Sequence, residues 1–460
     1  MLRRPVLLLS LLATSAWLAS CAQAPFAAAP PAVPAASALP PVVFVHGNGD
    51  SASIWLTALW RFESAGWSRD RLHAIDLPYP QSRDDDGVAQ DGRSSTTDHM
   101  RFLAAEVDKV LKATGAAQVA LVGNSRGGYA IRNYIANGGG DKRVSHAVLG
   151  GVPNHGVWAN PARGPGNEFN GAGPFLKALN TRADGNEVTP GPKWMTIRSD
   201  RNDKYAQPDG LWIGSKGVPT NVTFDGPALK GADVNAVLPG RDHREVSFHA
   251  EAVALTATFL GAREPARPGL ERQVAISLNG KVTGFTAAGP TNLPLVGASF
   301  EAYAVDGATG QRRGAALISK LIAADGHWGP LTTDSATALE FVISAPGQAI
   351  THIYRSPFAR SSDIVNLRPQ RLVVADKDAA AVLIMMRPRG YFGLGRDRIS
   401  FDGEAAPKDI SIGVPGVDTT RLRLTDNTDR PVVGEFNGER IVARAWSAAD
   451  NHISVLELHY

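Results

Sequence analysis

One stretch decides the fold: Val119-Ala-Leu-Val-Gly-Asn-Ser-Arg-Gly-Gly128. Its apolar start predicts a buried strand, and the turn that follows has the Gly-x-Ser-x-Gly pattern with Ser125 at its centre. Such a turn projects the serine hydroxyl into a cleft, and Gly123 and Gly127 leave room for close backbone packing that a Cβ would prevent. Apolar residues at helical spacing then predict a helix: Tyr129, Ile131, Tyr134 and Ile135. Its N-terminus adds positive potential and free N–H groups beside Ser125. The alternative is a Gly-Ser turn in an ordinary strand–helix–strand unit.

The residues on both sides of this stretch alternate between strand-like and helix-like runs, from Val42 to about Gly261. Apolar runs predict further strands at residues 42–45, 72–77, 145–149 and 194–198. Apolar residues at helical spacing predict helices at residues 54–67, 97–114 and 246–260. This alternation predicts an α/β domain in which helices cover both faces of a mostly parallel sheet.

The first predicted strand ends in a His-Gly loop, His46-Gly-Asn-Gly49. Together with the Ser125 turn, this loop resembles the α/β-hydrolase fold, and more narrowly the class 2 bacterial lipases, the small secreted Bacillus lipases. The segments Gly66–Asp76 and Val144–Gly151 add to the resemblance, which covers roughly residues 42–261. It implies a serine-dependent carboxyl-ester hydrolase of the lipase or esterase type, which acts through an acyl-enzyme on lipid esters and needs no metal or organic cofactor.

The order of catalytic residues in this fold is serine, then acid, then histidine. Asp203 is favoured as the acid, because it follows a predicted strand and has the family's register, a polar turn some residues before a proline, here Pro208. Asp200 is the alternative. His243 lies in what resembles the final loop of the fold and is the expected base, so that the predicted catalytic residues are Ser125, Asp203 and His243.

The resemblance also implies an oxyanion hole made by the backbone N–H groups of Asn48 and Arg126. His46 is expected to be a structural loop histidine, since it precedes the nucleophile. Asn124 and Arg126 depart from these lipases, which often have a histidine and an apolar residue at the two positions, and they put the polarity of the acyl pocket in question. The Arg126 side chain either pairs with a nearby carboxylate or meets an acidic or polymeric substrate.

Residues 151–193 lack periodicity and are rich in Gly, Pro and Asn. Segments of this length are usually functional or disordered. We expect a cap or lid-like insertion that forms a wall of the pocket, with His155 and Trp158 as substrate-binding residues; a mobile surface excursion is the alternative. His249 falls inside the last predicted helix and is expected to be a packed or surface residue.

The N-terminus has the pattern of a bacterial lipoprotein signal. A basic start precedes an apolar run, and residues 18–21 resemble a lipobox that ends at Cys21, the only cysteine of the chain. This predicts a signal peptide over residues 1–21 and a protein anchored to the cell envelope by a lipidated Cys21, at the outer membrane in a Gram-negative host; secretion after ordinary signal cleavage is the alternative. Residues 22–41 are mostly Ala and Pro and predict an extended tether.

Helical periodicity disappears after the predicted catalytic domain, residues 42–262. Short β-rich runs alternate instead with tight-turn signals of the Asn-Gly and Asp-Gly kind. Expected strands lie at residues 273–278, 300–305, 339–344, 351–354, 372–374, 382–386 and 453–458. The pattern predicts one or two antiparallel, sandwich-like modules, at 270–365 and 366–460, after a hinge at Pro265–Gly269. This tail resembles, more weakly, the β-domains of some prokaryotic lipases and would hold the catalytic domain near lipid or an insoluble polyester.

Charge and composition exclude some classes of partner. The chain has 47 Lys and Arg against 44 Asp and Glu, a net charge of +3, and the basic residues are scattered, so nothing indicates a nucleic-acid partner. The expected partners are an ester substrate and, through Cys21, a membrane. Two other functions stay open: an extracellular polyester depolymerase of the polyhydroxyalkanoate type, which the sequence does not separate from a lipase, and a non-enzymatic surface binding protein, against which the three predicted catalytic residues argue.

Overall fold

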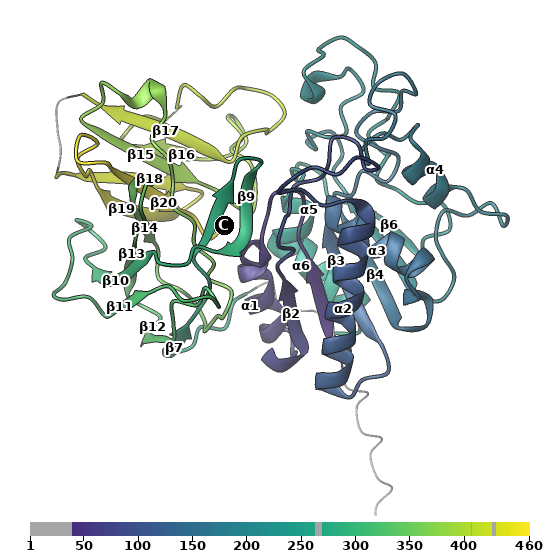
Figure 1. Ribbon diagram of the computed structural model, residues 1–460, viewed down its shortest axis with the longest axis horizontal. Helices are drawn as coiled ribbons and strands as arrows, with labels where there is room; N and C mark the ends of the chain where they lie inside the picture. Colours follow the sequence, from purple (N-terminus) through teal and green to yellow (C-terminus); the bar gives the residue numbers. More distant parts are fainter. Residues whose placement is uncertain (1–38, 263–268, 406, 426–428) are drawn as a thin grey trace, which may run out of the picture. The chain divides into compact units, whose positions relative to one another are not determined.

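The computed structural model describes residues 39–262, 269–405, 407–425 and 429–460 (Figure 1). The predicted signal segment 1–21 with Cys21, most of the tether at 22–41 and most of the hinge at Pro265–Gly269 lie outside the described residues. The boundaries of these segments therefore stay predictions.

A six-stranded sheet forms the framework of the first part of the chain. Its strand order is β2-β1-β3-β4-β5-β6, and every neighbouring pair is parallel. The strands are β1 (Val42–Val45), β2 (Leu72–Ile75), β3 (Val119–Asn124), β4 (Val144–Gly150), β5 (Lys193–Arg198) and β6 (Val234–Val237). The first five correspond to predicted strands. The sequence pattern misses β6, because this short edge strand alternates half-buried and exposed residues and has no apolar run.

Helices cover both faces of this sheet (Figure 1). Val43 and Val45 of β1 pack into the apolar cluster of α2 (Thr96–Thr114) and α3 (Arg126–Asn137). Val42 and Phe44 pack on the opposite face, in the cluster of α1 (Leu56–Ser64) and α6 (Ala250–Phe259). The remaining helices of this part are α4 (Pro174–Asn180), α5 (Glu245–Phe248), and the short 3-10 helices η1 (Ala52–Trp55), η2 (Arg69–Arg71), η3 (Gly140–Lys142) and η4 (Leu211–Ile213). Burial on both faces explains why β1 reads as a continuous apolar run.

The ends of α2 follow from local sequence chemistry. The Ser95 hydroxyl accepts a hydrogen bond from the Asp98 N–H at 3.1 Å, and the Asp98 carboxylate accepts one from the Ser95 N–H at 2.9 Å, which is a reciprocal N-terminal cap. Gly115 ends the helix with a φ of 65°, a left-handed conformation that glycine adopts without steric cost. In the part of the chain that the structure describes, no helix combines the length and the apolar character needed to cross a membrane.

The predicted helix at 246–260 is interrupted at His249. This residue has an extended backbone, with φ −63° and ψ 148°, and it separates α5 from α6. Its ring nitrogen accepts a hydrogen bond from the Glu251 N–H at 3.2 Å, so His249 caps α6 instead of lying inside a helix. The prediction of one continuous helix is therefore wrong, because apolar spacing alone does not reveal a side chain that captures a backbone donor.

The second part of the chain is almost entirely β-structure. Its largest sheet has seven strands in the order β11-β10-β13-β14-β20-β15-β17, and smaller sheets pair β12 with β7, β8 with β9, and β16 and β19 with β18. The bounds are β7 (Ala275–Leu278), β8 (Thr283–Thr286), β9 (Gly289–Pro294), β10 (Ser299–Val305), β11 (Ile318–Leu321), β12 (Leu331–Asp334), β13 (Ala338–Ser344), β14 (Ile350–Arg355), β15 (Ala381–Met386), β16 (Ile399–Phe401), β17 (Thr419–Leu424), β18 (Pro431–Phe436), β19 (Glu439–Arg444) and β20 (His452–Glu457).

This β-rich region does not divide at the predicted boundary between residues 365 and 366. Strand β20 lies between β14 and β15 in the seven-stranded sheet and pairs in parallel with both. One sheet thus takes strands from both predicted modules, and it is mixed rather than antiparallel, so these two parts of the prediction are wrong. Runs and turns along the sequence reveal strands but not the pairing of distant strands, which tertiary packing decides.

The predicted strand at 372–374 does not form either. Residues Val374–Asp376 make the 3-10 turn η5, in which the Asp376 carboxylate accepts a hydrogen bond from the Val373 N–H at 2.8 Å. Asp376 also pairs with Arg421 of β17. A three-residue apolar run is too short to outweigh these polar contacts.

The β-rich region and the α/β part share one hydrophobic core. A single cluster of buried apolar side chains contains residues from β1 and α1 and also from β10 and β13. At the junction, the rings of Trp60 and Phe358 meet edge to face at 6.1 Å, and the Trp60 indole N–H donates to the Ser361 carbonyl at 3.2 Å. Glu63 and Arg360 form an ion pair across the same junction at 2.6 Å. The two parts are therefore joined by buried apolar side chains, a hydrogen bond and an ion pair.

The close approach of α3 to β1 gives a testable stability prediction. A Cβ on Gly127 would collide with the Val45 carbonyl oxygen and lie 2.7 Å from the His46 carbonyl oxygen, and neither backbone atom has room to move. We expect Gly127→Ala to lower the free energy of unfolding by about 3 kcal/mol, measured as a shift of the urea midpoint. The control is Gly307→Ala, which meets nothing within 4 Å. Equal midpoints for the two variants would contradict the steric argument.

Candidate active site

Ser125 lies on a strained turn between β3 and α3. Its φ of 51° and ψ of −126° are rare for a residue with a side chain, and its N–H donates to the Gly150 carbonyl at 3.1 Å. Glycine on both sides makes the turn possible: a Cβ on Gly123 would lie 2.7 Å from Ile131, and one on Gly127 would collide with β1. Strained backbone of this kind concentrates at functional sites, where the surrounding structure enforces it.

His243 and Asp203 lie in direct contact. The Nδ1 atom of His243 is 2.9 Å from the Asp203 carboxylate, and both side chains are buried. Asp203 also accepts a hydrogen bond from the Tyr205 N–H at 2.8 Å, which fixes the orientation of the carboxylate. Asp200, the alternative acid, instead accepts hydrogen bonds from its own loop and from the Gly240 N–H at 3.2 Å. The structure therefore brings Asp203, and not Asp200, to His243.

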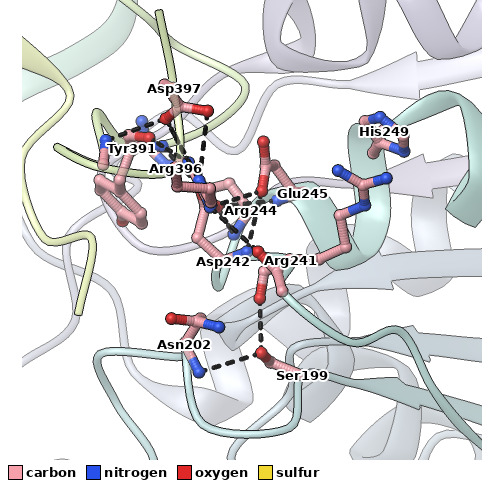
Figure 2. A network of polar contacts seen from close by, with 12 residues as sticks. Ser199, Asn202, Arg241, Asp242, Arg244, Glu245, His249, Tyr391, Arg396 and Asp397 are labelled. Atoms are coloured by element: carbon pink, nitrogen blue, oxygen red, sulfur yellow. Dashed lines mark hydrogen bonds and ion pairs between the residues drawn. The ribbon is translucent and has the colours of Figure 1, made fainter. Parts of the chain in front are cut away.

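Ser199 connects the loop that carries Asp203 with the loop that carries His243 (Figure 2). Its hydroxyl donates to the Arg241 carbonyl and accepts a hydrogen bond from the Asn202 N–H at 3.1 Å. Both loops follow strands of the parallel sheet at their carboxyl ends, where α/β folds gather their functional side chains.

Ser125 and His243 line one cavity of about 420 Å³. Its walls are rich in aromatic rings, and the lining also includes Asn48 of the His-Gly loop. The aromatic lining residues are Trp158, Phe169, Tyr205, Trp212 and Tyr391. The cavity thus combines aromatic rings with polar and charged side chains, among them Asp50, Arg163 and Arg244. A serine hydroxyl and an imidazole are in its lining, and Asp203 contacts the imidazole.

The two expected oxyanion-hole residues border this region. Asn48 lines the cavity, and its side chain is held by the Ser82 N–H, which donates to its carbonyl oxygen at 2.8 Å. The Arg126 amide is the first of α3, so it has no acceptor within the helix. A backbone donor of this kind next to Ser125 can stabilise negative charge that develops on a bound carbonyl oxygen. The Asn48 N–H as the second donor stays a prediction.

Asn124 links the turn at Ser125 to the His243 loop. Its side-chain amide donates to the carbonyls of Gly150 at 3.1 Å and His243 at 3.3 Å, and to the Ser247 hydroxyl at 3.0 Å. The amide thereby fixes the backbone of both the serine and the histidine segments. No local signal in the sequence indicates this linking role of Asn124, because two of its partners lie more than a hundred residues away along the chain.

The Arg126 side chain points away from the cavity lining and is paired with a buried carboxylate. It forms two contacts with Glu168, one of them at 3.1 Å, and donates to the Ser94 hydroxyl at 2.9 Å. Burial raises the pKa of Glu168, and the charge of Arg126 opposes this shift. The structure thus selects the first of the two expected alternatives for Arg126. Because Glu168 belongs to the segment 151–193, the pair also anchors that segment to α3.

The expected pocket role of His155 is wrong. Its Nε2 atom lies 2.9 Å from Glu187 and its Nδ1 atom 2.7 Å from the Gly226 carbonyl, and it is not among the lining residues of the cavity. Trp158, three residues on, does line the cavity. Polar partners on distant loops turn the imidazole away, and the sequence gives no indication of them.

His46 is buried and holds the loop after β1. Its Nε2 atom accepts a hydrogen bond from the Leu77 N–H at 3.1 Å, and its Nδ1 atom is 2.8 Å from the Gly47 carbonyl. Burial lowers the pKa of His46, which favours the neutral ring that the accepting Nε2 atom requires. These contacts confirm the expectation of a structural loop histidine.

Sequence reasoning missed several residues around the imidazole. The Tyr205 ring meets His243 edge to face at 4.6 Å, and burial raises the pKa of Tyr205 to about 12. The Lys204 amine lies 4.1 Å from the centre of the Tyr391 ring and donates to the Gly416 carbonyl at 2.9 Å, and burial lowers its pKa to about 8. Tyr391 and Gly416 belong to the β-rich region, so no pattern within the α/β sequence indicates them.

The chemistry that the site supports follows from the groups that it brings together. Among the described residues, no three or more histidine, cysteine or acidic side chains converge in a way that could hold a metal ion. The site offers a hydroxyl, an imidazole paired with a carboxylate, and backbone donors, which is the set of groups used in acyl transfer.

Comparison with known families agrees with this geometry. Residues 40–183 match the family model of the α/β hydrolase fold, and residues 274–372 match the model of the lipase C-terminal domain. The chain therefore has an α/β-hydrolase fold followed by a β-rich region that is similar to lipase C-terminal domains over residues 274–372, which agrees with the resemblance inferred from the sequence.

The solved structures found similar to this chain have low sequence identity and low TM-scores. The propeptide form of the Bacillus licheniformis lipase BlEst2 is 18% identical with a TM-score of 0.36, and the match covers 60% of this chain and 59% of that one. The mature form of that lipase is 20% identical with a TM-score of 0.35, and the match covers 49% of this chain and 93% of that one. Aspergillus fumigatus lipase B is 15% identical with a TM-score of 0.36, and the match covers 51% of this chain and 55% of that one. This chain thus spans less than two thirds of two of these three proteins.

The buried Arg126–Glu168 pair gives a second stability prediction. Removing one partner leaves the other charge buried without compensation, so we expect Glu168→Ala to lower the free energy of unfolding by about 3–5 kcal/mol. The control is Asp108→Ala at the exposed Asp108–Arg143 pair, where we expect a change of about 1 kcal/mol or less. Urea unfolding of both variants measures the difference. A Glu168→Ala variant as stable as Asp108→Ala would contradict the importance of this pair.

Proposed function

We propose that this protein is a serine-dependent carboxyl-ester hydrolase of the lipase or esterase type. The observation that carries the proposal is that Ser125 and His243 line the same cavity while the Asp203 carboxylate lies 2.9 Å from the far nitrogen of the imidazole. The strained turn at Ser125 and the lipase C-terminal domain match support it further.

In the proposed mechanism, the Ser125 hydroxyl attacks the ester carbonyl while Nε2 of His243 takes its proton. The carbonyl oxygen of the tetrahedral intermediate becomes negative and accepts hydrogen bonds from the backbone N–H groups of Asn48 and Arg126, each worth about 3–4 kcal/mol. The carbon–oxygen bond of the ester then breaks, and the proton on His243 goes to the departing alcohol. Asp203 holds the imidazole in the required tautomer and stabilises its charged form.

The acyl-enzyme is resolved by the same groups in reverse. Water gives a proton to His243 and attacks the acyl carbonyl, a second tetrahedral intermediate forms, and the bond to the Ser125 oxygen breaks as that oxygen takes the proton back. The products are a carboxylic acid and free enzyme. The aromatic walls of the cavity favour an apolar acyl group, which is why a lipid ester is the preferred substrate class and a polyester is the alternative outcome of a substrate test.

The test of this function is the hydrolysis of p-nitrophenyl esters from acetate to palmitate by the wild type and three variants. We expect Ser125→Ala and Asp203→Asn each to lower kcat by about 10⁴-fold or more, because they remove the nucleophile and the correct imidazole tautomer. Asp200→Asn is the matched control, since Asp200 supports the loop without touching His243. We expect it to lose less than about tenfold.

Each substrate outcome has a distinct meaning. Turnover that rises with chain length identifies a lipase, and a short-chain optimum identifies an esterase. Clearing of a polyhydroxyalkanoate emulsion in preference to a triglyceride emulsion would select the depolymerase. Full ester turnover in Ser125→Ala would refute the serine mechanism.

We also propose that the protein is exported and anchored to the cell envelope through a lipidated Cys21, on the basis of the signal-like sequence before it. We expect Cys21→Ser to move the protein from the membrane fraction to the soluble fraction of cells, measured by fractionation and immunoblotting. The Ser125→Ala variant is the control that keeps the signal intact. No change in distribution for Cys21→Ser would overturn the anchoring.

A further inference from the structure

Asp242, the residue before His243, is fully buried, and its contacts fix the backbone that follows His243 (Figure 2). Its Oδ1 atom accepts hydrogen bonds from the N–H groups of Arg244 at 2.9 Å and Glu245 at 3.0 Å. The Glu245 carboxylate in turn accepts one from the Asp242 N–H at 3.0 Å. Two carboxylates thus flank His243 and hold the start of α5, and both need positive partners because they are buried.

The positive partners come from the β-rich region. Arg387 contacts Asp242 at 3.2 Å and also pairs with Glu245, and Arg396 lies 3.3 Å from Asp242 and 2.9 Å from Glu245. Burial disfavours the charged form of Glu245, but the charges of Arg387 and Arg396 outweigh this effect and lower its pKa. The loop around His243 is therefore held by ion pairs that cross from one part of the chain to the other.

The same contacts fix Tyr391. Its N–H donates to the Asp242 carboxylate at 2.7 Å, and its carbonyl accepts hydrogen bonds from Arg387 at 2.6 Å and from Arg396 at 2.8 Å. Both polar groups of its backbone are thus tied to the ion-pair cluster. The side chain of Tyr391 lines the cavity that contains Ser125. One cluster consequently determines the place of the base and the place of one wall of the pocket.

We propose that the β-rich region completes the active site: Arg387 and Arg396 are positioning residues that hold the His243 loop through Asp242 and Glu245, and Tyr391 is a wall of the acyl pocket that determines which acyl groups fit. This inference rests on the proposed ester hydrolysis. It assigns the β-rich region a direct part in the reaction, besides any contact that the region makes with lipid or polymer.

Geometry explains why this cluster matters for the rate. Residues 238–244 form an irregular loop between β6 and α5, so hydrogen bonds and ion pairs, and not a regular element, determine where the imidazole lies. A displacement of a catalytic group by about 1 Å can lower a rate by about a hundredfold. Loss of Arg396 would loosen the loop and remove one of the two hydrogen bonds to the Tyr391 carbonyl, while Arg387 still holds that carbonyl at 2.6 Å. We therefore expect a larger effect on kcat than on KM.

The chain offers a matched control for this effect. Arg421 pairs with the buried carboxylate of Asp376 at 2.5 Å within the β-rich region, and its side chain is 20% exposed, against 23% for Arg396. Arg421→Ala and Arg396→Ala thus remove the same, similarly exposed side chain, from one carboxylate for Arg421 and from three for Arg396. Only Arg396 contacts the residues next to His243.

The experiment uses the full chain and two measurements. We expect Arg396→Ala to lower kcat for p-nitrophenyl butyrate on the order of tenfold to a hundredfold, while Arg421→Ala keeps the wild-type value. Hydrogen–deuterium exchange in a peptide covering residues 238–249 should become faster in Arg396→Ala only. Arg396→Lys keeps the positive charge but loses the planar guanidinium, which can bind two acceptors at once. We therefore expect its kcat to lie between those of Arg396→Ala and the wild type.

The outcomes separate the two proposals. Equal exchange and equal kcat in the two alanine variants would overturn the positioning role, and faster exchange with unchanged kcat would do the same. A lower kcat together with faster exchange, both found in Arg396→Ala and not in Arg421→Ala, would support the positioning role. If the wild type hydrolyses no ester, the proposed function fails, and with it the part in ester turnover that we assign to the cluster. The exchange comparison still decides whether Arg396 holds the His243 loop.

Tyr391 is tested by chain-length selectivity. Removing its ring enlarges the cavity, so we expect Tyr391→Ala to raise the ratio of kcat/KM for octanoate to that for acetate by roughly tenfold. Arg421→Ala again serves as the control and should keep the wild-type ratio. An unchanged ratio in Tyr391→Ala would show that the ring does not limit the acyl group.

Discussion

The structure depends on one steric constraint, the close approach of α3 to β1. At Gly127 the helix backbone lies so near the carbonyl oxygens of Val45 and His46 that no side chain can be placed between them. This approach forces the chain to turn within one residue at Ser125, which explains its positive φ. It also sets the N-terminus of α3 against the loop after β1, where Asn48 lies. The positions of the serine, the first helical amide and the Asn48 loop are therefore consequences of one packing contact.

Buried charges then connect distant segments to this centre. Arg126 at the start of α3 binds Glu168 of the segment 151–193, and Asp242 beside His243 binds Arg387 of the β-rich region. In each case a largely irregular segment is held by a buried ion pair whose separation costs free energy, because it would leave a charge in an apolar interior. Hydrophobic packing is less selective, since many apolar contacts are interchangeable. Ion pairs of this kind can therefore fix loops to one position where packing alone would permit several.

Local signals explain which features could be predicted from the sequence. The strand, turn and helix around Ser125 follow from apolar spacing and two glycines, and the order of the acid and the base follows from the resemblance. The pairing of β20 with β14 and β15 could not be predicted, nor could the contacts of Asn124, because each depends on partners far away in the chain. His155 illustrates the same limit: its position beside Trp158 indicated the pocket, but Glu187 holds it elsewhere.

The shared core and the shared ion pairs change what the β-rich region means for function. An appended module that only recruits substrate could be removed without changing the chemistry of the catalytic domain. Here removal would expose the Trp60 face that packs on Phe358 and would take away the arginines that pair with Asp242 and Glu245. Loss of activity after such a truncation would therefore not reveal whether the region binds substrate. Only substitutions that keep the fold, made on opposite sides of the same ion pairs, can separate recruitment of substrate from placement of the base.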